Sequence, residues 1–350
     1  MQTYSASRHR TALALAAAAL MTVGLLAGPA QAAPSGTSPI TAEKAAALAA
    51  HLDSAGSYLD SGSGRMVITV TTEAAAQAVR DAGGVPRVVR YTAADLRAGT
   101  DLLNRDALIA GTAWSVDPLS NQIVVTTDET VTGAKLSRLT AVTDRLGNRV
   151  RLQSTQGVLS QVSTGGEAIF GEVYRCSLGF NVRNRGAYYF LTAGHCANLA
   201  TTWYSDAEKT TALGTRTGTS YPTNDYGIFR YNQGVPHPGV VDLYAAGTQD
   251  ITSARAAYVN EPIRRSGSTT GVRSGTVTGL NATVNYAEGS VFGLIQTSAC
   301  AEGGDSGGPL FDNTIALGIA SGAAGDCTTG GSTFFQPIIE VLKAYNVRVY

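Results

Sequence analysis

Charge of either sign is scarce in this chain of 350 residues. Lysine and arginine together number 26, aspartate and glutamate also number 26, and charged residues make up only 15% of the sequence. No block of basic residues interrupts this balance, so the positive surface of a nucleic-acid-binding protein is missing. We therefore expect no nucleic-acid partner.

Long apolar runs are absent after the first 32 residues. Within them, Thr11–Leu26 is apolar and uncharged, follows a short basic stretch, and precedes Ala30-Gln31-Ala32, whose small residues suit a signal peptidase. A membrane anchor is the alternative, but the run is short and Gly28-Pro29 interrupts its end. We expect residues 1–32 to be a signal peptide and the rest of the chain to be secreted without an anchor.

Cysteine is rare and confined to one half of the chain. The four cysteines are Cys176, Cys196, Cys300 and Cys327. An even number in a secreted chain predicts two disulfides, and four cysteines allow three pairings. A zinc site is the alternative, but neither a CxxC pair nor a histidine cluster accompanies these residues. We expect no metal and no other cofactor.

Heptad repeats are also absent while glycine is abundant, with 40 residues, which argues against a coiled coil or a helical bundle. Between residues 33 and 162 the pattern predicts a mixed α/β segment. Helices are expected near 41–52, 72–81, 93–109 and 131–146, and strands near 66–70, 85–90 and 149–152. A hairpin is expected over 114–126, with its turn at 118–121. This segment has no cluster of site residues. It is either a separate binding domain or a propeptide that assists folding and blocks an enzyme.

From residue 163 onward the sequence is typical of an all-β domain. Short apolar runs at 188–191, 227–231, 274–280 and 317–319 are separated by clusters of small and polar residues, as in a sandwich or barrel. Only Ile338–Tyr345, which follows Pro337, has the length and apolar spacing of a helix.

Histidine is as scarce as cysteine, with four residues in the chain. His9 lies in the expected signal peptide, His51 in the α/β segment, and His237 between two prolines in an expected loop. That leaves His195, directly after an apolar strand and beside Cys196. A lone histidine is more often structural than catalytic, so its role depends on the other residues of the site.

The strongest single motif is Gly304-Asp305-Ser306-Gly307-Gly308-Pro309. A serine nucleophile needs a neighbouring base and donors for the oxyanion, and the glycines let backbone N–H groups face a substrate. The nucleophile elbow of α/β-hydrolases also fits the bare pattern, but its histidine follows the serine, and none follows Ser306. The subtilisin order needs an aspartate before His195, and none lies between residues 163 and 194. The order His, Asp, Ser remains.

Four aspartates lie between His195 and this motif: Asp206, Asp225, Asp242 and Asp250. Asp225 differs from the others because its surrounding sequence runs from a turn into an apolar strand, where a carboxylate can be buried against an imidazole. The other three lie in polar, loop-like sequence. From the pattern alone, Asp225 could also be a solvated turn residue.

The region after residue 163 resembles the streptogrisin-type proteases of the bacterial chymotrypsin-like family. The motifs that carry the resemblance are Arg175–Val182, Leu191–Cys196, Asn224–Gly227, Arg265–Gly271, Cys300–Glu302, Gly304–Gly308 and Thr333–Pro337. The resemblance implies His195 as general base, Asp225 as the carboxylate that orients it, and Ser306 as nucleophile. It implies the N–H groups of Gly304 and Ser306 as oxyanion hole.

The same resemblance implies the fold and the domain organisation. A propeptide at 33–162 would precede a mature serine protease domain at 163–350. That domain would be all-β, with two six-stranded antiparallel β-barrels at about 163–258 and 259–350 and a C-terminal helix. The implied disulfides are Cys176–Cys196 and Cys300–Cys327.

Asp305 adjoins the expected nucleophile, and a buried carboxylate there needs a cation. In proteases of this type an arginine just before the Ser-Gly-Ser-Thr-Thr-Gly run supplies it. Arg265 holds that position in this sequence, and Arg264 is the alternative.

Ser321-Gly322-Ala323 resembles the strand that pairs with substrate backbone. The lining expected for the S1 pocket consists of Ala301, Ala320, Ala323 and Thr333, which predicts cleavage after Phe, Tyr, Leu or Met. The family usually carries glycine at the position of Ala323 and proline at that of Gly303. We therefore expect a narrower S1 entrance and a less ordered oxyanion loop.

These expectations describe a secreted, monomeric serine endopeptidase that acts on proteins or peptides. The other expected partners are its own propeptide and protein inhibitors of proteases, without a membrane or nucleic acid. Two alternatives remain from the sequence: a catalytically inactive homologue that binds a protein partner, and an esterase with the same acyl-transfer chemistry.

Overall fold

A computed structural model of the chain describes residues 38–155, 160–161 and 166–350. Leu159 and Val162, two residues near the expected maturation point, lie outside these ranges, as does the expected signal peptide. The described residues belong to one unit that spans Thr37–Tyr350. None of the helices in the described ranges is long and apolar enough to cross a membrane.

The α/β segment, residues 38–155, begins with a three-stranded sheet. Its elements are α1 (Ala42–His51), β1 (Ser57–Asp60), β2 (Arg65–Val70), α2 (Glu73–Asp81) and β3 (Val85–Val88). Strand β2 is central, antiparallel to β1 and parallel to β3. The Thr41 and Thr72 side chains cap the two helices by accepting hydrogen bonds from Lys44 N and Ala75 N. The sequence did not predict β1, a short strand with one buried residue, Tyr58.

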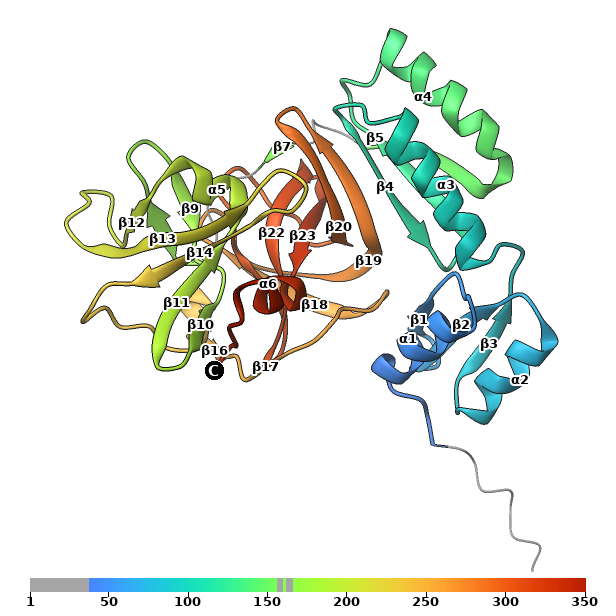
Figure 1. Cartoon of the computed structure of the whole chain (residues 1–350), viewed down its shortest axis with the longest axis horizontal. Coiled ribbons are helices and arrows are strands. Elements are labelled where there is room, and N and C mark those ends of the chain that lie inside the picture. Colours follow the sequence, from blue (N-terminus) through green and yellow to red (C-terminus); the bar gives the residue numbers. More distant parts are fainter. Residues whose placement is uncertain (1–37, 156–159, 162–165) are drawn as a thin grey trace, which may run out of the picture. The chain divides into compact units, whose positions relative to one another are not determined.

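The second half of this segment packs two helices on one face of a sheet (Figure 1). Its elements are α3 (Ala93–Asp106), β4 (Thr112–Asp117), β5 (Gln122–Thr127), α4 (Gly133–Leu146), η1 (Gly147–Arg149) and β6 (Val150–Ser154). A capping box formed by Thr92 and Asp95 begins α3. Leu103, Ile123 and Leu139 are fully buried where α3, β5 and α4 meet.

The next strands form a first antiparallel barrel. They are β8 (Ala168–Phe170), β9 (Arg175–Ser177), β10 (Asn181–Asn184), β11 (Ala187–Thr192), β12 (Thr202–Tyr204), β13 (Ala212–Ser220) and β14 (Tyr226–Tyr231). Their order in the sheet is β10-β11-β14-β13-β12-β8-β9. The two edge strands, β9 and β10, are consecutive in the chain, and the short connection between them keeps the two edges of the sheet close together. Phe190, Trp203 and Phe229 fill the interior.

A second antiparallel barrel follows a connection that contains β15 (Val240–Asp242), η2 (Tyr244–Ala246), β16 (Thr248–Asp250) and β17 (Ser253–Ala254). Its strands are β18 (Pro262–Gly267), β19 (Gly271–Tyr286), β20 (Gly289–Thr297), β21 (Pro309–Asp312), β22 (Ile315–Asp326) and β23 (Gly330–Pro337). The order β18-β21-β22-β23-β20-β19 closes because β18 also pairs with β19. The expected fold, two antiparallel barrels after an α/β segment, is confirmed. The expected strand number holds for the second barrel, whereas the first sheet has seven strands in the described residues instead of six.

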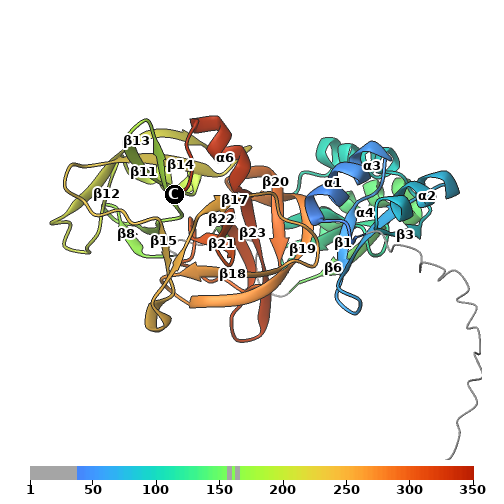
Figure 2. The same cartoon turned by 90° about the horizontal axis from the view of Figure 1, so that it is seen from below.

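Helix α6 (Ile338–Tyr345) ends the domain where the sequence predicted it. Figure 2 shows α6 beside strands of both barrels. Ile338 and Val341 are fully buried among residues of both barrels, including Phe180 of the first and Phe311 of the second. The helix therefore packs where the barrels meet and contributes to the hydrophobic core between them.

The expectation of a single helix after residue 163 was wrong. A short helix, α5 (Gly194–Leu199), follows β11 directly and carries His195. It is too short to show a helical apolar period, and His195, Cys196 and Ala197 are all buried. Its formation depends on packing in the first barrel rather than on an amphipathic pattern.

Two further ladders join the earlier part of the chain to the second barrel. Strand β4 pairs antiparallel with β19, with Thr112 opposite Asn285 and Val116 opposite Leu280. The short strand β7 (Ser160–Gln161) pairs antiparallel with β22. Two stretches of backbone that precede residue 163, β4 and β7, therefore pair with strands β19 and β22 of the second barrel.

Candidate active site

Asp225 holds His195 through two different groups. Asp225 Oδ1 accepts the backbone N–H of His195 at 2.8 Å, and the carboxylate lies 2.9 and 3.1 Å from His195 Nδ1. Asp225 is fully buried and His195 is 8% exposed. The Nδ1 atom therefore donates to the carboxylate, and Nε2 is left to accept a proton from another group.

Residues of the second barrel hold Asp225 in turn. Its backbone N–H donates to Gln336 Oε1 at 2.8 Å, and the Ser321 hydroxyl donates to Asp225 Oδ2 at 2.7 Å. Gln336 belongs to the Thr333–Pro337 motif, but sequence reasoning gave it no role. Asp225 directly precedes β14 of the first barrel, and residues of β22 and β23 in the second barrel set the orientation of its carboxylate and backbone.

Ser306 is fully buried beside the start of α5. The adjacent Gly307 has a positive φ of 86°, and a Cβ there would lie 3.2 Å from Ala193 N, two residues before His195. The Ser306 Oγ atom makes no hydrogen bond to any residue in the described ranges, and His195 Nε2 lies 3.5 Å from Cys196 Sγ. The structure therefore brings Ser306 to the histidine segment without joining the two side chains.

The loop before Ser306 presents backbone N–H groups. Asp305 N donates to Glu302 O at 2.9 Å, whereas the N–H groups of Gly304 and Ser306 find no acceptor in the part of the chain that the structure describes. Gly304 has a φ of 122°, a conformation that residues with a Cβ rarely adopt. The two free donors lie on either side of Asp305.

Arg265 is the cation beside Asp305. The two side chains are 1% and 0% exposed, and Arg265 Nη2 lies 3.2 Å from Asp305 Oδ2. Burial lowers the pKa of the Arg265 guanidinium, and the Asp305 carboxylate partly offsets this effect. Asp305 also accepts hydrogen bonds from Glu302 N and the Thr270 hydroxyl. Arg264 instead donates to Gln249 and lies over the ring of Phe311.

The residues expected to line S1 have different environments. Ala301 and Ala323, 2% and 3% exposed, form a small apolar cluster of their own. Ala320 lies in the apolar core of the second barrel, and Thr333 is fully buried with its hydroxyl donating to Ala299 O. The side chains of Ala301 and Ala323 therefore meet where β22 faces the loop after Cys300.

Both disulfides brace segments of the site. Cys176–Cys196 ties β9 to α5, with an S–S distance of 2.09 Å, and Cys300–Cys327 ties the loop before Ser306 to the residue after β22. This is the pairing that the resemblance implies. Glu302 Oε1 accepts the N–H of Cys327, so this carboxylate supports the loop rather than standing free in a pocket.

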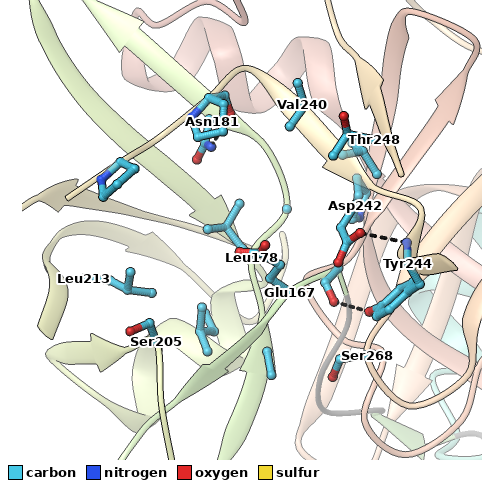
Figure 3. A pocket seen from close by; sticks show the side chains of 18 of the residues that line it. Glu167, Leu178, Asn181, Ser205, Leu213, Val240, Asp242, Tyr244, Thr248 and Ser268 are labelled. Atoms are coloured by element: carbon cyan, nitrogen blue, oxygen red, sulfur yellow. Dashed lines mark hydrogen bonds between the residues drawn. The ribbon is translucent and has the colours of Figure 1, made fainter. Parts of the chain in front are cut away.

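A cavity of about 750 Å³ is lined mainly by residues of the first barrel and of the connection that follows it, and by none of His195, Asp225 and Ser306. Figure 3 shows its acidic part, where Asp242 accepts a hydrogen bond from Tyr244 N and the Tyr244 hydroxyl donates to Gly166 O. Partial burial raises the pKa of Glu167, and Asp242 adds to the effect.

The described ranges contain no cluster of side chains suited to bind a metal ion. No group of three or more His, Cys, Asp or Glu side chains there is placed to hold a metal ion.

Three protein families match consecutive parts of the chain. "Alpha-lytic protease pro N-terminal" matches residues 30–89, "Alpha-lytic protease prodomain" matches 91–147, and "Trypsin-like peptidase domain" matches 176–317. The first two cover most of the α/β segment, and the third contains the three candidate catalytic residues.

Individual relatives span nearly the whole chain. Serine protease 1 of Streptomyces fradiae is 48% identical over 98% of this chain and 99% of its own length. Streptogrisin-D of Streptomyces griseus is 47% identical over 90% of this chain and 82% of its own. A solved structure titled as a glutamic acid specific serine protease is 53% identical, covers 53% of this chain and 99% of its own, and superposes with a TM-score of 0.52.

Proposed function

Because the chain belongs to the streptogrisin family of serine proteases, we propose that it cleaves peptide bonds through an acyl-enzyme formed on Ser306. His195 is the general base and Asp225 the carboxylate that orients it. The observation that carries this proposal is the pair of hydrogen bonds that the Asp225 carboxylate accepts from the backbone N–H and from Nδ1 of His195. These hydrogen bonds favour the imidazole tautomer with its proton on Nδ1, which leaves Nε2 free to accept a proton from Ser306.

The reaction follows from these positions. Ser306 Oγ attacks the carbonyl carbon of the substrate while its proton passes to His195 Nε2, and the imidazolium is stabilised by Asp225. The N–H groups of Gly304 and Ser306 donate to the oxyanion that develops. His195 then protonates the leaving amine, and a water molecule, activated in the same way, hydrolyses the acyl-enzyme.

The substrate preference is for apolar side chains at P1: Phe, Tyr, Leu or Met. Ala301 and Ala323 support this because both are apolar and neither brings a charge to the pocket wall. Glu302, an acid near these residues, is occupied by the N–H of Cys327. The methyl group of Ala323 narrows the entrance and favours the smaller of these side chains.

The precursor is secreted and matures by cleavage. Residues 1–32 are the signal peptide, 33–162 the propeptide and 163–350 the mature protease. The two prodomain matches support this division, as does the pairing of β7 with the expected substrate strand.

Labelling with a fluorophosphonate, followed by peptide mapping, tests the function. We expect the label on Ser306 in the secreted protein and none in Ser306→Ala. His195→Ala and Asp225→Asn should lower kcat/KM on a peptide amide by about 10⁴-fold or more. A folded protein that takes no label would be an inactive binder, and one that hydrolyses esters but no peptide would be an esterase; either outcome would refute the proposal.

A further inference from the structure

Tyr286 is a buried tyrosine that contacts the network around Asp225. It is the last residue of β19, is 3% exposed, and its hydroxyl lies 3.2 Å from Ser321 Oγ. Burial raises its pKa above the usual tyrosine value. The hydroxyl therefore keeps its proton over the working range of a protease and remains a hydrogen-bond donor.

The direction of this hydrogen bond follows from the other partner of Ser321. The Ser321 hydroxyl has one proton, which it donates to Asp225 Oδ2 at 2.7 Å. A carboxylate only accepts, so Ser321 Oγ must accept from Tyr286. The sequence of donors is Tyr286 to Ser321 to Asp225, and His195 donates to the same carboxylate from Nδ1.

Packing and backbone pairing hold the Tyr286 side chain in place. A Cβ at Gly322 would collide with the Tyr286 ring and hydroxyl, so the side chain lies directly against the backbone of β22. Its backbone pairs with Gly289 of β20, and the Ser290 hydroxyl donates to Oδ1 of the preceding Asn285. The end of β19 is thereby held against β20 by residues of the protease domain itself.

We propose that Tyr286 is a positioning residue for the catalytic pair Asp225 and His195. By donating to Ser321 Oγ, its hydroxyl fixes the rotamer of the Ser321 hydroxyl, which then holds the Asp225 carboxylate against the imidazole. Hydrogen bonds in a chain polarise one another, so the donor from Tyr286 also strengthens the bond from Ser321 to Asp225. The inference rests on the proposed function, which gives Asp225 and His195 their roles.

The test is Tyr286→Phe, which keeps the ring and removes the hydroxyl. The matched control is Tyr231→Phe, which removes a hydroxyl that donates to Asn181 Oδ1 at 2.7 Å in the first barrel and contacts none of the triad residues. Both variants are expressed as the full chain, and active sites are titrated so that rates refer to folded enzyme. We expect kcat of Tyr286→Phe to fall about three- to tenfold, with KM within about twofold.

The pH profile separates positioning from simple structural support. A weaker bond from Ser321 leaves more negative charge on Asp225, which stabilises the imidazolium of His195. The acid limb of the kcat/KM profile should therefore move to higher pH in Tyr286→Phe and stay in place in Tyr231→Phe. A lower yield of titratable enzyme with unchanged kcat and an unchanged acid limb would overturn the proposal.

A double variant tests the route through Ser321. If Tyr286 acts only through that hydroxyl, Tyr286→Phe added to Ser321→Ala should cost no further activity. A second loss of the same size as the first would contradict it. Near-normal activity of Asp225→Asn would instead refute the proposed function, so the two failures are distinguishable.

Discussion

Ser160 lies opposite Ala323 in the antiparallel pairing of β7 with β22, and Gln161 lies opposite Gly322. Each step forward along β7 is therefore a step back along β22 toward Ser321, whose hydroxyl donates to Asp225. The backbone that precedes the proposed mature domain thus adds to the proposed substrate strand and runs toward Ser321, as we expect an extended substrate to do.

This direction predicts where the precursor is cut. We expect the secreted protein to begin within about three residues of Ser163, because β7, which ends at Gln161, runs along β22 in the direction of Ser321. Intact-mass measurement of the secreted form gives the new N-terminus. The Ser306→Ala precursor should remain uncut when produced without other proteases. Processing of that variant at the same position would show that another enzyme makes the cut.

The propeptide should be needed for folding. Strand β4 completes the outer edge of β19, so residues 163–350 alone lack a template for this part of the second barrel. We expect refolding of 163–350 to give little active enzyme and the separate propeptide, added in trans, to restore it. The assay is the fraction of titratable active sites. High recovery from 163–350 alone would contradict the prediction.

The Ala323 side chain should limit the size of P1. A methyl group in an apolar pocket changes discrimination by roughly 1–3 kcal/mol, so Ala323→Gly should raise the kcat/KM ratio of Phe over Leu about tenfold. A peptide series that varies only P1 measures this ratio. The wild-type chain on the same series is the control. A wild-type maximum at Arg, Lys or Glu would show that the pocket is not apolar.

Loss of the Arg265 guanidinium should destabilise the site loop. Arg265→Met leaves the Asp305 carboxylate buried without its cation, which typically costs about 3–5 kcal/mol. Thermal unfolding of the full chain in a Ser306→Ala background measures the loss. Arg264→Met, on the same strand, is the control and should have a smaller effect. Addition of Asp305→Asn should restore part of the stability; no recovery would contradict the ion-pair explanation.

Asp326 should contribute stability that depends on pH. The N–H groups of Thr329 and Thr328 donate to its carboxylate and lower its pKa below the ordinary 3.8. A carboxylate whose pKa is lower in the folded than in the unfolded state stabilises the folded state at pH values above its unfolded pKa. This contribution is lost as the pH falls through the folded pKa. The melting temperature of Asp326→Asn should therefore lie slightly below that of the parent at neutral pH. The difference should shrink below pH 3.8; a difference that grows on acidification would refute it.

Local motifs and their order along the chain were enough to select His195, Asp225 and Ser306 as candidates. Asp225 could be preferred over the other aspartates because an apolar strand follows it. The supports of Asp225 could not be found in this way. Gln336 contacts Asp225 directly and Tyr286 does so through Ser321, both from the second barrel, and Gln336 is 111 residues away in the sequence. Such partners depend on strand register, which no local pattern in this sequence specifies.

Strand β19 carries β20 along one edge and β4 along the other at Val284 and Asn285. Departure of the propeptide would uncover the second edge, and exposed sheet edges invite other chains to pair with them. The uncovered edge is irregular: its pairing with β4 shifts register between Leu280 and Thr283, and Asn281 has a φ of 53°. A bent, irregular edge offers another copy few consecutive partners. The irregular backbone of β19 should therefore make edge-to-edge pairing between copies of the mature protease less favourable.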